Sequence, residues 1–147
     1  MKLTIELVPK TAWYSNVRSN VTQAEWDVLR KECYKKAGYK CEVCAGKGPN
    51  HPVECHEIWE YDDGECKQTL AGLIALCPGC HQVKHIGLAQ IQGNYEKALE
   101  HLAKVNEITI DDAKLYVESC FETWSQRSQK EWKLDITILE NKKDESN

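Results

Sequence analysis

The chain contains two Cys-x2-Cys pairs, Cys41 with Cys44 and Cys77 with Cys80. Each pair can form a tight turn that presents two sulfur atoms at once, and two such pairs supply the four thiolates of a tetrahedral zinc site. Because the pairs are well separated in the sequence, the segment between them must fold back to bring them together. We therefore predict a closed structural zinc site that fixes this part of the fold.

The remaining composition favours metal binding over disulfides. The chain has 147 residues, of which 41% are hydrophobic and eight are cysteine. Its start lacks a signal-peptide pattern and no apolar run is long enough to cross a bilayer, so we expect a cytoplasmic protein without a membrane partner. Cysteines at these spacings in that compartment bind metal. Residues 77–81 also match the c-type haem attachment pattern, which would require export and leave the other pair unused.

Three histidines lie beside the cysteine pairs. His81 follows Cys80 directly and His85 comes four residues later, so a helix beginning at Pro78 would project both rings from one face. His56 lies on a predicted strand facing that helix, where a neutral imidazole can take a proton from water. The spacing predicts a second metal site at His81 and His85, with exposed or purely structural histidines as the alternative.

Periodicity predicts an α+β fold in a single domain, 1–147. The predicted parts are a core at 39–88, a helical extension with a final strand at 89–140, and a disordered tail at 141–147. We expect the first and last strands to pair. The predicted elements are a strand at 3–8, a helix at 23–37 capped by Thr22 and Glu25, strands at 53–61 and 69–76 around the turn Asp62-Asp63-Gly64, a helix from Pro78 to near Gly87, helices at 94–106 and from Thr109 to about Trp124, and a strand at 132–138.

Charge is distributed unevenly along the chain. The net charge is −4, but residues 1–50 carry an excess of basic side chains and the remainder an excess of acidic ones. A basic patch beside a metal site can hold phosphates, although a solvated helix face would look the same. The aromatic and basic segment 13–19 is a further candidate for contact with nucleic acid or for the core. The basic patch near the first cysteine pair consists of Arg30, Lys31, Lys35, Lys36, Lys40 and Lys47.

The order of cysteine pair, histidine, cysteine pair and histidine closely resembles the HNH endonuclease family of the zinc-stapled, four-cysteine type. The resemblance spans about residues 39–86, and its most specific part is the run Leu-Ile-Ala-Leu-Cys-Pro-Gly-Cys-His at 73–81. It implies a ββα-metal core with one divalent cation. Carried over, His56 is the general base that activates water, His81 binds the catalytic metal, and His85 matches the extra helix histidine of some members.

Two positions depart from the family pattern. Cys55 stands where many members carry a metal-binding Asp or His, and no Asn lies between His56 and His81, although the family expects one near Gly72. The resemblance assigns that Asn to orienting the base histidine. In place of the Asn, a backbone carbonyl or the side chain of Gln68 or Thr69 could orient the ring of His56.

The identity of the metal at His81 and His85 depends on which further residue coordinates it. Glu57 or Glu54 would supply an oxygen that suits Mg²⁺ or Mn²⁺, whereas Cys55 with the two helix histidines would favour Zn²⁺ or Ni²⁺. Strand alternation places Glu54 and His56 on one face and Cys55 and Glu57 on the other.

We therefore expect a metal-dependent endonuclease that cleaves nucleic acid, with DNA as the expected substrate. Lys84 and the basic residues at 30–40 would approach phosphates. The second hypothesis is a zinc-dependent module that binds nucleic acid without cleaving it. The third is a protein-interaction domain whose acidic C-terminal half binds a basic partner.

Overall fold

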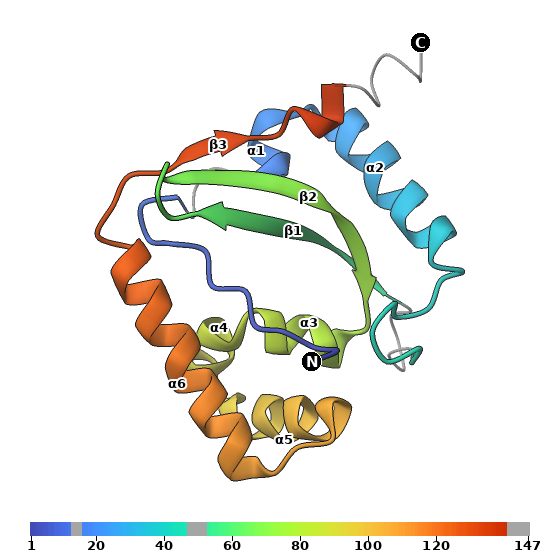
Figure 1. Cartoon of the computed structure of the whole chain (residues 1–147). Coiled ribbons are helices and arrows are strands. Elements are labelled where there is room, and N and C mark those ends of the chain that lie inside the picture. Colours follow the sequence, from blue (N-terminus) through green and yellow to red (C-terminus); the bar gives the residue numbers. More distant parts are fainter. Residues whose placement is uncertain (13–15, 47–52, 141–147) are drawn as a thin grey trace.

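The computed structural model describes residues 1–12, 16–46 and 53–140 (Figure 1). The predictions for Lys47, for residues 13–15 and for the tail at 141–147 lie outside these residues. The fold is α+β, with helices around a three-stranded sheet. None of the helices in the described ranges combines the length and apolar character needed to span a bilayer. In chain order the elements are α1 (Val17–Asn20), α2 (Gln23–Lys36), β1 (Glu54–Asp62), β2 (Lys67–Leu76), α3 (Pro78–Lys84), α4 (Ile86–Ile91), α5 (Tyr95–Asn106), α6 (Ile110–Arg127) and β3 (Lys133–Asp135).

β1 and β2 form the predicted antiparallel hairpin. The side chain of Asp62 accepts hydrogen bonds from the backbone N–H groups of Gly64 and Glu65, both at 3.0 Å, and these bonds stabilise the turn. His56 lies opposite Ile74 in the resulting register. The hairpin ends where Cys77 begins the turn into α3, so the chain order of strand, strand and helix is as predicted.

The prediction that the two terminal segments pair as strands is wrong, because β3 pairs in parallel with the start of β2. Residues 3–8 form an extended segment whose backbone bonds to side chains. The N–H of Leu3 donates to Oδ1 of Asn106 at 2.9 Å, and the N–H of Ile5 donates to the hydroxyl of Tyr116 at 3.0 Å. Leu3 and Ile5 are buried. The alternation therefore reflects an extended segment with one buried face.

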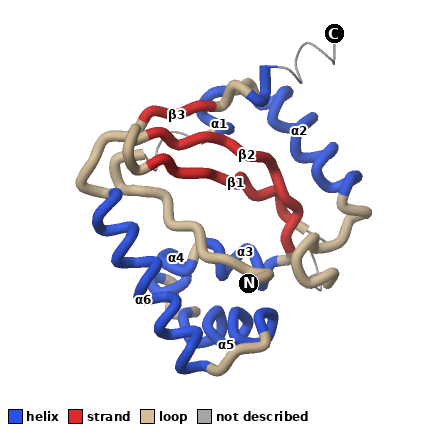
Figure 2. The backbone as a smooth tube through the Cα atoms, viewed as in Figure 1, coloured by secondary structure: helices blue, strands red, loops and turns tan. Residues whose placement is uncertain are grey.

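Helices cover both faces of the hairpin (Figure 2). α1 and α2 lie on one side, α3 and α4 on the other, and α5 and α6 pack beyond α3 and α4. The two longest helices begin at predicted caps. The hydroxyl of Thr22 accepts from the N–H of Glu25 at 3.1 Å, and the hydroxyl of Thr109 accepts from the N–H of Asp112 at 3.0 Å.

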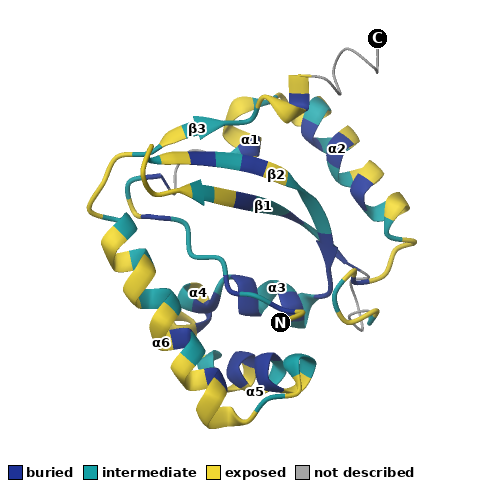
Figure 3. Ribbon diagram, in the orientation of Figure 1, coloured by how far each residue is buried: buried dark blue, intermediate teal, exposed yellow. Residues whose placement is uncertain are grey.

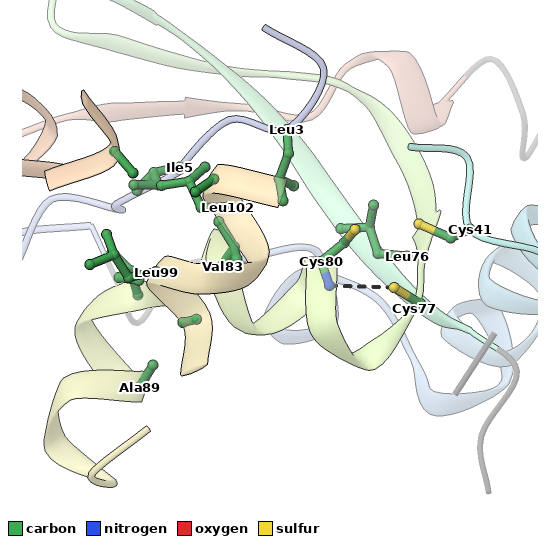
Figure 4. Packing of buried hydrophobic residues seen from close by; sticks show 14 of the residues in the cluster. Leu3, Ile5, Cys41, Leu76, Cys77, Cys80, Val83, Ala89, Leu99 and Leu102 are labelled. Atoms are coloured by element: carbon green, nitrogen blue, oxygen red, sulfur yellow. Dashed lines mark hydrogen bonds between the residues drawn. The ribbon is translucent and has the colours of Figure 1, made fainter. Parts of the chain in front are cut away.

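The largest core cluster surrounds α3, as the buried positions in Figure 3 show. Leu76, Val83, Leu99 and Leu102 are fully buried, and Figure 4 shows Cys80 among them. Burial of an aliphatic side chain of this size stabilises a fold by about 1.5–3 kcal/mol. The helix that carries Cys80 is therefore held by β2 on one side and α5 on the other.

The helix that follows Pro78 is shorter than predicted. α3 ends at Lys84, and His85 adopts a non-helical conformation (φ −103°, ψ 47°) before α4 begins. The N–H of His85 still donates to the carbonyl of His81 at 3.2 Å. The two histidines therefore remain one turn apart although the helix breaks between them and α4.

Candidate metal centres

The four predicted zinc ligands lie together where the loop after α2 meets the start of α3. The sulfur atoms of Cys41, Cys44, Cys77 and Cys80 all lie within 4.8 Å of one another, and those of Cys44 and Cys77 are 3.6 Å apart. A tetrahedron with Zn–S bonds of about 2.3 Å has sulfur–sulfur edges of about 3.8 Å. The cluster therefore fits a structural zinc site.

Backbone hydrogen bonds fix both cysteine pairs. In each pair the N–H of the second cysteine donates to the sulfur of the first, at 3.5 Å in the first pair and at 3.4 Å in the second, which is drawn in Figure 4. Glu42 joins the first pair to β2, because its N–H donates to the carbonyl of Ala75 at 2.9 Å and its carboxylate accepts from the N–H of Ala75 at 2.7 Å. Both pairs are thereby held at the same end of the hairpin.

Contacts between neighbouring thiols shift their pKa values. A hydrogen bond with the Cys80 thiol lowers the pKa of Cys41 to about 4, and the same hydrogen bond raises the pKa of Cys80. One thiolate therefore forms at the expense of its neighbour. A bound dication would supply the positive charge that lets all four thiols ionise.

The three histidines form a second cluster. His56 comes from β1, His81 from α3 and His85 from the junction with α4, and one ring nitrogen of each lies within 4.8 Å of the other two. The Nε2 atoms of His81 and His85 are 3.1 Å apart. Two nitrogen ligands at about 2.1 Å from one metal lie about 3.0–3.4 Å apart, for octahedral to tetrahedral angles. The cluster is therefore a possible metal-binding site, and the three residues come together as predicted.

Burial keeps two of these rings neutral. Burial lowers the pKa of His81, against the opposing charge of Glu54, and burial together with the nearby His81 lowers the pKa of His85 to about 4. Neutral imidazoles are the form that binds metal. The carboxylate of Glu54 contacts Nδ1 of His81, which leaves Nε2 directed toward His85. A carboxylate behind a ligating histidine is the usual support of such a ligand.

Glu6, which the sequence analysis did not single out, holds the third histidine. Its Oε2 lies 3.1 Å from Nε2 of His56, and its Oε1 lies 3.3 Å from Nζ of Lys84, which also donates to the hydroxyl of Thr4 at 2.7 Å. Burial opposes ionisation of Glu6, but the hydrogen bond to His56 and the charge of Lys84 outweigh it and lower the pKa of Glu6. The N-terminal segment thus places a carboxylate against His56.

A cavity of about 410 Å³ adjoins the three histidines on one side. A second cavity, of about 310 Å³, touches His81 and His85 from the side of α4. The histidine cluster is therefore open to small molecules. Residues that line the first cavity include Glu6, Asn16, Arg18, Glu57 and Gln68.

The other predicted ligands and orienting residues lie apart from the histidine cluster. The thiol of Cys55 is hydrogen-bonded with Cys33, and Glu57 accepts a hydrogen bond from the N–H of Val17 at 3.1 Å. Both line the cavity, but neither belongs to the group of three ring nitrogens. Within the described part of the chain the amide of Gln68 has no hydrogen-bond partner, so it does not replace the expected Asn at His56.

The predicted phosphate-contacting residues do not converge on the histidines. Lys84 is only 5% exposed and is bonded to Glu6 and Thr4, a position that does not favour contact with phosphates. Arg30 forms an ion pair with Asp27 at 3.0 Å. α2 lies across the hairpin from α3, as Figure 1 shows. The exposed basic residues on and after α2 are Lys31, Lys35, Lys36 and Lys40.

His101, a second residue missed from the sequence, contacts the cysteine cluster from α5. Its Nε2 lies 3.2 Å from the sulfur of Cys80, and burial lowers its pKa. A Cβ atom on Gly79 would lie 3.0 Å from the His101 ring, so a larger residue at this position would push the ring away. In the sequence His101 is only a histidine on a predicted helix, and nothing near it indicates that it would contact Cys80.

Comparisons with family models, curated proteins and solved structures gave no match for this chain. Its functional interpretation therefore rests on the two clusters themselves.

Proposed function

We propose that the chain is a metal-dependent nuclease of the HNH type, which hydrolyses phosphodiester bonds of nucleic acid, with DNA as the expected substrate. The observation that carries the proposal is the group of three histidine nitrogens within 4.8 Å at the base of the hairpin. The cysteine cluster supports it, because it fixes the start of the helix that carries His81.

His81 and His85 would hold the metal. Their facing Nε2 atoms and lowered pKa values suit coordination, and Glu54 supports His81 from behind. When bound, a divalent cation stabilises the negative charge on the phosphate and on the leaving oxygen. Because the nearest donors are imidazole nitrogens, we expect Zn²⁺ or Ni²⁺ rather than Mg²⁺.

His56 would act as the general base. If its Nε2 carries the proton donated to Glu6, Nδ1 is the basic nitrogen that can take a proton from water. The carboxylate of Glu6 then faces the imidazolium that forms, and Lys84 holds the carboxylate from its other oxygen. Glu6 would thus orient His56, the task that the family resemblance assigns to an Asn.

Plasmid nicking with added Zn²⁺, Ni²⁺, Mn²⁺ or Mg²⁺, combined with metal analysis, tests this proposal. We expect His56→Ala to lower the nicking rate by about 10²- to 10⁴-fold, the usual contribution of a general base, while both metals stay bound. The matched control is Gln90→Ala on the exposed side of α4, which should nick like the wild type.

Three other outcomes have distinct meanings. Loss of one metal per chain in His56→Ala would show that His56 is a third metal ligand and not the general base. A shift in DNA mobility without nicking by any of the four metals would replace the nuclease with a binding module. Absence of both nicking and binding would contradict both functions.

A further inference from the structure

We propose that His101 is a positioning residue of the cysteine cluster, and that its Nε2–H group donates a hydrogen bond to the thiolate of Cys80 when zinc is bound. The inference goes beyond the proposed function, because it concerns how the chain retains its structural metal and is tested without nucleic acid. Hydrogen-bond partners of metal ligands orient those ligands and adjust the affinity of the site.

The donors to the four sulfur atoms reveal an asymmetry between the two cysteine pairs. In the first pair both sulfurs accept backbone N–H groups, Cys41 from Cys44 at 3.5 Å and Cys44 from Gly46 at 3.4 Å. In the second pair the first sulfur also accepts a backbone N–H. The sulfur of Cys80 instead lies 3.2 Å from Nε2 of His101. A side chain thus takes the place that a backbone group fills at the other three thiols.

The helical position of Cys80 explains why a side chain is needed. The sulfur of the second cysteine in the first pair accepts from the residue two positions later, which lies in a loop. The residue two positions after Cys80 is Gln82, which lies inside α3, where an N–H donates to the carbonyl four residues back. α5 packs against α3 (Figure 1) and brings His101 onto the sulfur.

His101 approaches the cluster from outside the set of ligands. Among the described residues, the group of donors within 4.8 Å of one another consists of the four sulfurs and does not include this ring. Four thiolates around one Zn²⁺ carry a net charge of about −2, and an N–H group directed at one of them offsets part of it. Cys80 is fully buried, so solvent does not reach its sulfur to supply this donor.

Competition for zinc with the chromophoric chelator pyridylazoresorcinol tests the role of the ring. His101→Leu removes the donor and should lower the zinc affinity by about 10- to 100-fold, the usual effect of losing such a partner. His101→Gln keeps an N–H donor and should restore most of the affinity. The matched control is Lys97→Leu, the same substitution at an exposed residue that lines the same outer cavity as His101, which should bind zinc like the wild type.

A second variant disturbs the contact without changing the histidine. Gly79→Ala places a Cβ atom 3.0 Å from the His101 ring, which must move away from Cys80. Because alanine favours a helix more than glycine does, the substitution does not weaken α3 itself. We therefore expect Gly79→Ala to lower the zinc affinity in the same direction as His101→Leu.

The cobalt-loaded protein separates this role from a merely structural one. Loss of the N–H donor makes the thiolate easier to oxidise, so the thiolate-to-cobalt charge-transfer band should move to longer wavelength in His101→Leu and Gly79→Ala. The band should stay in place in His101→Gln and Lys97→Leu. In the zinc-loaded wild type, nitrogen NMR of the labelled imidazole should find the proton on Nε2 of His101.

Three results would overturn the proposal. They are an unchanged zinc affinity and cobalt band in His101→Leu, a wild-type imidazole protonated on Nδ1 alone, and a wild-type cobalt spectrum of three thiolates and one nitrogen, which would make His101 a ligand. If His101→Leu does not fold, Gly79→Ala and the NMR measurement on the wild type decide the question. None of these measurements depends on nicking.

Discussion

The cysteine cluster and the histidine cluster differ in how far they are closed. The cysteines come from the loop after α2 and from the start of α3. The sulfur atoms of Cys41 and Cys77 accept backbone N–H groups, and Cys41, Cys77 and Cys80 lie in the apolar core around α3. The histidines come from β1, from α3 and from the junction of α3 with α4. His56 contacts the carboxylate of Glu6, His81 contacts that of Glu54, and the cluster opens onto two cavities. A closed set of donors suits structure, and an open set beside a cavity suits chemistry.

The difference also shows how each cluster depends on the rest of the chain. The cysteine pairs are local motifs that need only one reversal of the chain to meet. The histidine cluster needs the hairpin for His56, the helix break for His85 and the N-terminal segment for Glu6. The three predictions that follow separate the two clusters, from the largest expected effect to the smallest.

Loss of one zinc ligand should unfold the protein. Structural zinc contributes about 10–16 kcal/mol to small domains, which is comparable to the whole stability of a typical fold, about 5–15 kcal/mol. We therefore expect Cys80→Ser to lose zinc and to show no cooperative thermal transition. Cys66→Ser in the hairpin turn, outside the cluster, should retain both zinc and the transition. A folded, zinc-free Cys80→Ser protein would remove the structural role of the cluster.

Neutralising Glu6 should impair the histidine cluster and spare the cysteine cluster. Glu6→Gln keeps the shape but removes the charge that faces His56 and Lys84, and loss of such a supporting carboxylate typically costs about 10- to 100-fold in activity. We expect nicking to fall by this factor and its pH profile to shift, while zinc content stays at the wild-type value.

The exposed acid Glu60 provides the matched control for Glu6. Glu60→Gln should leave both the rate and the pH profile unchanged. A Glu6→Gln protein with an unchanged pH profile would show that Glu6 stabilises the fold without acting on His56.

Mild acid should destabilise the histidine cluster by a smaller amount. The folded pKa of His85, about 4, lies below the unfolded value of about 6.5, so the unfolded state takes up the proton first and stability falls as the pH falls. For the zinc-loaded protein without a second metal, we expect a loss of about 1 kcal/mol between pH 7 and pH 5.5 in urea unfolding. His85→Asn should lose less. Equal stability at both pH values would contradict a buried, neutral His85.

Local signals in the sequence predicted most of the elements. The capping residues Thr22 and Thr109, the turn at Asp62 and the two cysteine pairs all act within a few residues, so each was recognisable without knowledge of the tertiary structure. The order of strand, strand and helix, and the meeting of the three histidines, follow from these signals because one hairpin brings both cysteine pairs together.

Long-range pairing was not predictable. Glu6 is fifty positions from His56 in sequence, and alternation in residues 3–8 predicts an extended backbone without identifying what lies beside it. Lys84 is a residue type that is normally exposed, and only its bonds to Glu6 and Thr4 explain its burial. The parallel pairing of β3 with β2 likewise depends on where α6 returns the chain.

The anchoring of the N-terminal segment sets an order in which the site can be assembled during synthesis. Leu3 is bonded to Asn106 in both directions, at 2.9 and 2.8 Å, and Ile5 is bonded to Tyr116 on α6. Such contacts span more than one hundred positions in the sequence, and contacts of this separation form late in folding. The hairpin and both cysteine pairs leave the ribosome before α6 exists. The two cysteine pairs can therefore come together first in the nascent chain, whereas the bonds that anchor the segment carrying Glu6 form only after α5 and α6 have been synthesised.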